Sequence, residues 1–505
     1  MANPFTRRAL PHRLPPLLVA AAAFIAMGLL GLSCSDANGP HAEQASGRSG
    51  NHQRPVILIS IDSLRADFSS VYGHKSIFAA DVPTMPFLQE LADGGVLFEN
   101  ASAASPWTLP SHMTLLTGMN AVEHGVRSRK FALAKNIELV SGRFKNAGYK
   151  TGGFFSAPFL HPAWGFGAGF DVYMPSADYL GSIAAGTALS AAGKSEEVEI
   201  IHHQSHTDAE TGAQVVDRAL GWLEHDKNYQ EPFFLFLHFW DPHYDYFPPK
   251  EYAEMFHPGY HGDLIGDELM QLDRELSSAE MDHLKALYEA EIRYTDDQIR
   301  RLFARLEELG IADDVIVAIV SDHGDEFGEH GNRGHHLTLL QEVMHVPMVL
   351  HAPGLIAGGQ RVTASVSIRD VAPTLIDLAG VPAWTDRSGE SLRSLWETRD
   401  ESREVSMDLL RPTRKMELLG YRKGMMKGIL DRKAEPTALS FTILDLAADP
   451  GELHPSAHRI TEDLPFAKAA LEFLSAVMES RHQVQKVKEA AEITDLLSQV
   501  GYTED

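Results

Sequence analysis

Three apolar runs constrain the fold of this chain more than any other feature of its sequence. They are rich in β-branched or aromatic residues and almost free of polar ones, and they comprise Val56–Ile61, Phe233–Leu237 and Val315–Val320. Such runs are typical of strands that are buried on both faces of a parallel sheet. A weaker run, Val346–Leu350, contains a proline. Helical spacing between the runs, as in Ala279–Leu309, completes an alternation that predicts a doubly wound α/β domain.

Aspartate and histidine residues follow each of the three predicted strands. Asp62 ends the first, Asp241 and His243 lie beyond the second, and Asp322 and His323 lie beyond the third. Ligands of open α/β sheets bind beyond the carboxyl ends of the strands. One aspartate there is often only a helix cap, but three such ends at one edge favour a metal or catalytic site.

Thr108 lies in a short loop that leads through Pro110 into a helical stretch, which Ser111 is expected to cap. We therefore expect Thr108 just before a helix N-terminus, where backbone N–H groups favour anions such as sulfate or phosphate. From these residues alone, a threonine that only caps the helix remains an alternative.

The first 34 residues are typical of an export signal. A basic start precedes an apolar run, Leu17–Leu32, that is shorter than the ~20 residues of a membrane span. Cys34, the only cysteine, stands where bacterial lipoproteins carry their acylated cysteine, and an ordinary signal residue is the alternative. Residues 35–54 have the composition of a linker. We expect a periplasmic protein or an outer-membrane or cell-surface lipoprotein, with membrane contact only through that lipid anchor.

From about residue 403 the sequence changes character. Strand patterns at Tyr421–Leu430 and Phe441–Leu446 are followed by helical ones. This change predicts a catalytic α/β domain over residues 55–402 and a smaller C-terminal α+β domain with a helical tail over residues 403–505.

Several motifs, in order along the chain, resemble those of the sulfatase family. They are Ile59–Asp67, Pro86–Phe98, Ala104–Gly118, Asp241–His243, Ser321–Gly331, Asp370–Leu375, Leu444–Leu446 and Asp449–Glu452. The resemblance covers nearly the whole chain after the export signal. It implies an alkaline-phosphatase-like α/β/α sandwich and a metal-dependent ester hydrolase.

Thr108 departs from the sulfatase pattern. Sulfatases have Cys or Ser there and oxidise it to formylglycine, whereas oxidation of a secondary alcohol gives a ketone. Sulfatases belong to the alkaline-phosphatase superfamily. In other members, the nucleotide pyrophosphatase/phosphodiesterases and phosphoethanolamine transferases, threonine is the direct nucleophile. The resemblance thus implies that Thr108 itself attacks a sulfuryl or phosphoryl group.

Asp62, Asp322 and His323 are the expected ligands of one divalent cation, which would stabilise the threonine alkoxide. Carboxylates suit Ca²⁺, Mg²⁺ or Mn²⁺, and imidazole favours Mn²⁺ or Zn²⁺. A second cation remains an alternative, with ligands Asp241, His243 and His335.

Further histidines complete the expected site. His243 or His335 would protonate the leaving group. The resemblance places three more on the substrate side, namely His112, where sulfatases have Arg, and His124 and His336.

The sequence therefore predicts a hydrolase of sulfate or phosphate esters that acts on an anionic small molecule, glycan or lipid. The net charge of −25 at pH 7 opposes binding to nucleic acid. Alternatives are a phosphodiesterase or phospho-head-group transferase at the cell envelope, and a catalytically silent binding protein. The joint presence of Thr108 and three ligands favours the enzyme.

Overall fold

The computed structural model describes residues 53–176, 211–260, 274–398, 403–412, 414–432, 440–459, 465–480 and 485–486. The expected export signal with Cys34, most of the expected linker and the tail after residue 486 lie outside these ranges. Within the described ranges, no helix combines the length and apolar character needed to cross a membrane.

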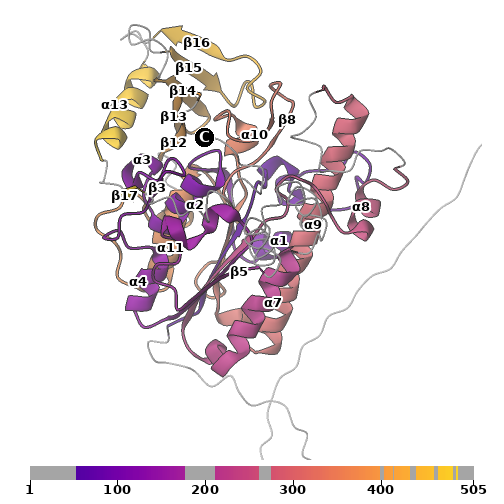
Figure 1. Ribbon diagram of the computed structural model, residues 1–505, viewed down its shortest axis with the longest axis vertical. Helices are drawn as coiled ribbons and strands as arrows, with labels where there is room; N and C mark the ends of the chain where they lie inside the picture. Colours follow the sequence, from indigo (N-terminus) through magenta and orange to yellow (C-terminus); the bar gives the residue numbers. More distant parts are fainter. Residues whose placement is uncertain are drawn as a thin grey trace, which may run out of the picture. The chain divides into compact units, whose positions relative to one another are not determined.

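An eight-stranded sheet forms the centre of the fold (Figure 1). Its strands lie in the order β11-β2-β10-β7-β1-β6-β4-β5. Their bounds are β1 Val56–Ile61, β2 Val96–Ser102, β4 Lys150–Phe155, β5 Val172–Pro175, β6 Phe233–Phe239, β7 Ile316–Ser321, β10 Met348–His351 and β11 Gln360–Ser367. The sheet is mixed, because β10 runs antiparallel to both of its neighbours while the other pairs are parallel.

The three strands predicted from apolar runs are the adjacent strands β7, β1 and β6. Ile61 at the end of β1 pairs with Phe239 of β6 and Ser321 of β7. Because the strands are parallel and in register, the residues that follow all three leave the sheet at the same edge.

Helices cover both faces of this sheet, as Figure 1 shows. Alternate residues of β1 belong to two different cores, Val56 and Leu58 to one and Ile57 and Ile59 to the other. On the first face lie α2 Thr108–Thr117, α4 Val140–Asn146 and α11 Val371–Leu378, and on the second lie α1 Pro86–Asp93, α7 Thr211–Glu224 and α9 Ser278–Glu308. The expected α/β/α sandwich is confirmed.

Four shorter α-helices and two small sheets also belong to the described part of the chain. The helices are α3 Ala121–His124, α8 Lys250–Phe256, α10 Gln341–Met344 and α12 Arg393–Thr398. Two small antiparallel sheets pair β3 Phe131–Ala132 with β17 Gln485–Lys486, and β8 Glu326–Phe327 with β9 Arg333–Gly334.

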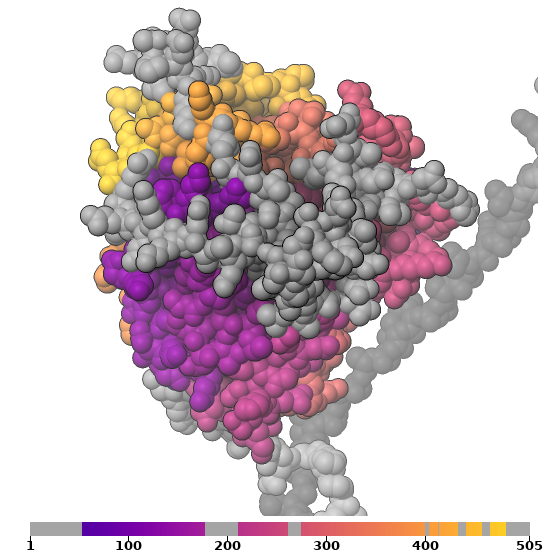
Figure 2. Space-filling view, in the orientation of Figure 1, coloured from indigo at the N-terminus to yellow at the C-terminus, as the bar shows by residue number. Residues whose placement is uncertain are grey.

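A second, antiparallel sheet is formed by C-terminal residues. Its strands are β12 Glu404–Arg411, β13 Met416–Lys423, β14 Met426–Asp431, β15 Ser440–Asp445 and β16 Ser456–Arg459, and α13 Pro465–Glu479 packs against it. In Figure 2 these orange to yellow residues lie beside purple residues from early in the chain. This sheet matches the smaller α+β part expected from the sequence, while its exact boundary with the rest stays a prediction.

Two strand predictions were wrong in detail. The run Tyr421–Leu430 is not one strand, because the chain turns at Gly424, whose φ is 59°, and divides into β13 and β14. The weaker run begins as a strand only after Pro347, which has no N–H for a ladder, and its direction is antiparallel.

Candidate active site

Thr108 is the first residue of α2, and its side chain is buried, with 1% exposed. The helix therefore begins four residues earlier than expected, and its N-cap is Trp107 and not Ser111. Ser111 Oγ instead donates to the Asp322 carbonyl at 2.6 Å, which ties α2 to the end of β7. Thr108 thus lies among the first backbone N–H groups of a helix, where anionic oxygens are favoured.

The structure brings Thr108 together with Asp62, Asp322 and His323. Thr108 Oγ1 lies 3.5 Å from Asp62 Oδ2 and 3.4 Å from His323 Nε2. His323 Nε2 lies 3.5 Å from Asp62 Oδ1 and 3.3 Å from Asp322 Oδ2. One ligand atom from each acidic residue and from His323 falls within a group 4.8 Å across. All four side chains are buried.

The donor set of this cluster fits a divalent cation. His323 Nδ1 lies 3.1 Å from the Gly324 carbonyl, which fixes the proton on Nδ1 and leaves the lone pair of Nε2 facing the two carboxylates. Asp322 Oδ2 is buried, with His112 Nδ1 at 3.2 Å and His323 Nε2 at 3.3 Å. Burial and the nearby Asp322 carboxylate raise the pKa of Asp62 well above its usual value. A positive ion between these oxygens would relieve that repulsion.

Ser63 holds the two carboxylates in place. Its φ of 56° puts it in the left-handed region directly after β1. There its N–H donates to Asp322 Oδ1 at 3.2 Å, and its hydroxyl donates to Asp62 Oδ1 at 3.2 Å. Backbone strain of this kind, at a cost of order 1–3 kcal/mol, persists where the surroundings fix it and clusters at functional sites.

The contacts of His112 do not fit the substrate-binding role expected from the sequence. Its Nε2 lies 2.8 Å from Ser60 Oγ, and its Nδ1 lies 2.9 Å from the Thr108 carbonyl and 3.2 Å from Asp322 Oδ2. Burial lowers the pKa of His112, but the Asp322 carboxylate outweighs it and the pKa is raised. Both ring nitrogens of His112 therefore have partners within the protein, and the ring helps to hold Asp322 and the start of α2 in place.

His124 lies away from the cluster, at the far end of α2. Its Nε2 lies 3.1 Å from Thr114 Oγ1, and its Nδ1 accepts from the Val126 N–H at 3.1 Å. Burial lowers its pKa to about 3. Because both ring nitrogens bond within the protein, these contacts do not fit the expected substrate contact.

His335 and His336 lie beside the cluster, as expected. The rings of His323 and His335 have centroids 4.3 Å apart, and those of His335 and His336 are also 4.3 Å apart. His335 Nδ1 lies 2.6 Å from Asp325 Oδ1, whereas its Nε2 is buried and makes no hydrogen bond to the described residues. Burial lowers the pKa of His335 to about 3.

His243 joins this group, but Asp241 does not. The ring centroid of His243 lies 5.1 Å from that of His335. Asp241 Oδ2 accepts from Thr211 Oγ1 at 2.9 Å and from the Gly212 N–H at 3.3 Å, which caps the start of α7. The contacts of Asp241 therefore do not fit the expected second-cation role.

A second donor set adjoins the first and shares His323 with it. The ligand atoms of His323, Asp325 and His335 lie within 4.8 Å of one another. Asp325 Oδ2 also accepts from Tyr246 Oη at 2.9 Å, and burial raises the pKa of Asp325 to about 6.

Sequence reasoning missed two residues that support the cluster. His238 in β6 is fully buried, and its Nε2 lies 3.2 Å from Asp62 Oδ2. Ser60 in β1 contacts His112. Each is the lone polar residue of an otherwise apolar, fully buried strand, and that exception was the signal available in the sequence.

Comparisons with known proteins agree with this architecture. The family model described as Sulfatase matches residues 54–381, which is more than half of the chain. An arylsulfatase of Clostridium perfringens is 26% identical over 392 residues, covering 69% of this chain and 79% of that enzyme.

Solved structures share the fold. The phosphonate monoester hydrolase of Agrobacterium radiobacter has a TM-score of 0.64 and 20% identity, covering 85% of this chain and 95% of that one. A protein in complex with its substrate D-glucosamine-2-N,6-O-disulfate has a TM-score of 0.65 and 18% identity, covering 85% and 97%. The chain belongs to the sulfatase family of the alkaline-phosphatase superfamily and is an enzyme of the sulfuric ester hydrolase type.

Proposed function

We propose that this enzyme cleaves sulfate or phosphate esters by direct attack of Thr108 on the sulfuryl or phosphoryl group. The observation that carries the proposal is the position of Thr108 Oγ1, buried at the N-terminus of α2 and within 3.5 Å of both Asp62 and His323. A hydroxyl that only capped a helix would bond to backbone N–H groups, and Thr108 makes no such bond within the described residues.

Asp62, Asp322 and His323 would hold a divalent cation, which supplies the positive charge that favours the ionised threonine hydroxyl. The first N–H groups of α2 orient the non-bridging oxygens of the substrate towards Thr108 Oγ1. The hydroxyl proton of Thr108 passes to His335 as the bond from Oγ1 to sulfur or phosphorus forms, and His335 gives that proton to the leaving oxygen as the bond to it breaks. Water then attacks the covalent ester, and Thr108 regains its proton.

His335 is placed to carry the protons of these steps. Asp325 holds Nδ1, the ring lies beside that of His323, and Nε2 makes no hydrogen bond to the described residues. Burial lowers the pKa of His335 to about 3, so the ring of the free enzyme is neutral near pH 7 and can accept a proton. The negative charge of a bound substrate raises that pKa and lets the same ring protonate the leaving oxygen. His243, whose ring centroid lies 5.1 Å from that of His335, is the second candidate.

Threonine chemistry makes phosphate esters at least as suitable as sulfate esters. The likeness to an arylsulfatase supports sulfate esters, and the shared fold with a phosphonate monoester hydrolase supports phosphoryl substrates. The sugar disulfate bound by another protein of this fold supports an anionic glycan as substrate.

The test is a panel of p-nitrophenyl sulfate, phosphate, phenylphosphonate and phosphodiester, assayed with Mn²⁺, Zn²⁺, Ca²⁺ or Mg²⁺. Thr108→Ala should lower kcat/KM by about 10³-fold or more, since it removes the group that forms the covalent ester. Thr108→Ser should retain part of the activity. Thr398→Ala, in the exposed part of α12, is the matched control and should change nothing.

Wild-type turnover by Thr108→Ala would reject the nucleophile assignment. Transfer to an added alcohol without net hydrolysis would indicate a transferase, and no turnover with any metal would indicate a binding protein.

We also propose that the chain is exported and acylated on Cys34. Palmitate labelling of the full-length protein in a bacterial host, with Cys34→Ser as control, tests this. Equal labelling of both proteins contradicts it.

A further inference from the structure

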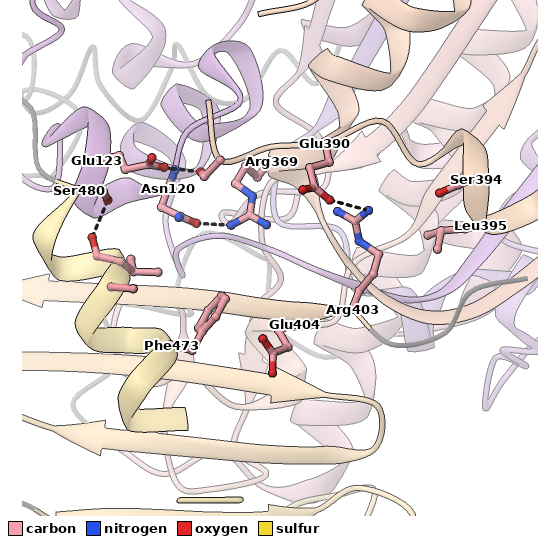
Figure 3. Close-up of a pocket in the computed structure, with 13 residues that line it drawn as sticks. Asn120, Glu123, Arg369, Glu390, Ser394, Leu395, Arg403, Glu404, Phe473 and Ser480 are labelled. Carbon is pink, nitrogen blue, oxygen red and sulfur yellow. Dashed lines mark hydrogen bonds and ion pairs between the residues drawn. The ribbon is translucent and has the colours of Figure 1, made fainter. Parts of the chain in front are cut away.

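A cavity of about 530 Å³ lies at the opposite end of α2 from Thr108. Asn120 and Glu123 on its wall follow the C-terminal end of α2, a helix of ten residues. Such a helix is about 15 Å long, so the cavity is separate from the active site. Figure 3 shows walls from α3, from the segments around Arg369 and α12, and from β12 and α13. Its volume is one that ligand pockets commonly have.

Two guanidinium groups supply donors on this wall. Arg369 is 6% exposed, and its Nη1 donates to Asn120 Oδ1 at 2.7 Å. Its Nε makes no hydrogen bond to the described residues and lies 3.6 Å from Asp370 Oδ1. Arg403 lies 3.0 Å from the other oxygen of Asp370 and 3.6 Å from Glu390. Both cations are thus fixed, and one of them retains a buried donor.

Carboxylates stand beside these donors as acceptors. Glu123 is 7% exposed, and one of its oxygens accepts from the Asn120 N–H at 2.7 Å. Glu404 accepts from Tyr421 Oη at 2.6 Å and pairs with Lys423 at 3.1 Å. Because guanidinium and carboxylate groups line the same cavity, a simple anion or a simple cation would meet like charge on one wall.

The remaining lining adds a flat apolar surface and hydroxyl groups. Phe473 of α13 and Leu395 of α12 line the cavity (Figure 3). Val477, also in α13, belongs to the same lining. Ser394 and Ser480 also line the cavity. A ring with C–H groups on one face and hydroxyls around its edge matches this combination, since each hydroxyl both donates and accepts.

We propose that this cavity is a binding site for a neutral sugar residue of a glycan, distinct from the site of hydrolysis. The sugar ring packs on Phe473, and its hydroxyls bridge Arg369 or Arg403 to Glu123 or Glu404. The site does not depend on which ester Thr108 cleaves.

Isothermal titration calorimetry on the full chain tests this, with unsulfated β-linked tetrasaccharides of glucose, galactose, mannose and xylose as probes. We expect at least one to bind with a Kd of about 0.1–1 mM. Ala476→Trp fills the cavity from an exposed position of α13, and it should weaken that binding at least about tenfold. Ser475→Trp, equally exposed on the same helix but outside the lining, is the matched control.

Melting curves for both variants verify that they fold. Thr108→Ala should leave the sugar affinity unchanged, because the two sites are separate, so a failure of the proposed hydrolysis is distinguishable from a failure of this proposal. No binding of any tetrasaccharide up to about 10 mM overturns it. So does equal affinity of Ala476→Trp and wild type, or binding of free amino acids in place of sugars.

Discussion

Asp408 of β12 connects the C-terminal sheet to the loop that precedes Thr108. Its N–H donates to the Ala104 carbonyl at 2.9 Å, and its carbonyl accepts from Ser105 Oγ at 2.7 Å. Its carboxylate accepts from Arg127 Nε at 2.7 Å and from Nη2 at 2.5 Å, and the two side chains are only 6% and 8% exposed. The substitution Asp408→Ala removes this carboxylate and leaves a buried guanidinium.

The cost follows from the surroundings of Arg127. Removal of one partner from a buried ion pair costs about 3–5 kcal/mol. Glu417 Oε1 still lies 3.0 Å from Arg127 Nη2, so we expect the lower end, about 3 kcal/mol of unfolding free energy. Because the affected loop positions the nucleophile, kcat/KM should also fall about tenfold or more.

Urea denaturation followed by tryptophan fluorescence measures the first effect, and the ester assay measures the second. The double variant Arg127→Met/Asp408→Leu should recover most of the stability, since it removes both charges of the pair, while Glu417 keeps Arg432 at 3.4 Å. Glu397→Ala breaks the exposed Arg393–Glu397 pair and should cost no more than about 0.5 kcal/mol. A loss below about 1 kcal/mol for Asp408→Ala, or a double variant as unstable as the single one, refutes the reasoning.

Three further outcomes are expected. Removal of divalent cations with EDTA should lower the melting temperature, because a ligand at a hundred times its Kd adds about 2.7 kcal/mol to the folded state; an unchanged melting temperature contradicts a resident cation. Burial raises the pKa of Asp296 to about 7, so the unfolded chain loses this proton first as the pH rises. The unfolding free energy measured in urea should therefore fall between about pH 4 and pH 7, by at most about 1.4 kcal/mol per pH unit, and less steeply in Asp296→Asn. If the unfolding free energies of wild type and Asp296→Asn fall equally with pH, the raised pKa of Asp296 is contradicted. Gly95→Ala should lower the urea midpoint, because its Cβ would lie 2.1 Å from the Leu350 carbonyl. Gly221→Ala in α7, with nothing within 4 Å, should instead raise the midpoint, by about 1 kcal/mol in free energy; a midpoint that Gly95→Ala leaves unchanged contradicts the steric reasoning.

The centre of the sheet could be predicted because β1, β6 and β7 are buried on both faces, so their sequences are almost entirely apolar. Asp62, Asp322 and His323 could be found for the same reason, since a parallel register carries strand ends to one edge. The direction of β10 could not be found, because a four-residue strand has the same side-chain pattern whichever way it runs.

Side-chain partners were harder to predict than backbone positions. Asp241 follows β6 as expected, yet its carboxylate caps α7, which starts thirty residues earlier in the sequence. His112 and His124 lie in the expected segments, but their bonds to Ser60 and Thr114 depend on how α2 packs. The start of α2 was misplaced because Pro110 was assigned to a loop and Ser111 to the cap, although proline is tolerated within the first turn of a helix.

The helix that carries the nucleophile has no face turned towards solvent, since all ten of its residues are buried. Densely packed interiors transmit displacement and do not absorb it locally. The position of the Thr108 hydroxyl therefore depends on the packing of all of α2. That packing includes the contact at the C-terminal end between Thr114 and the imidazole of His124 in α3. Residues far from the reacting atoms thereby help to position the nucleophile, although they do not contact a substrate.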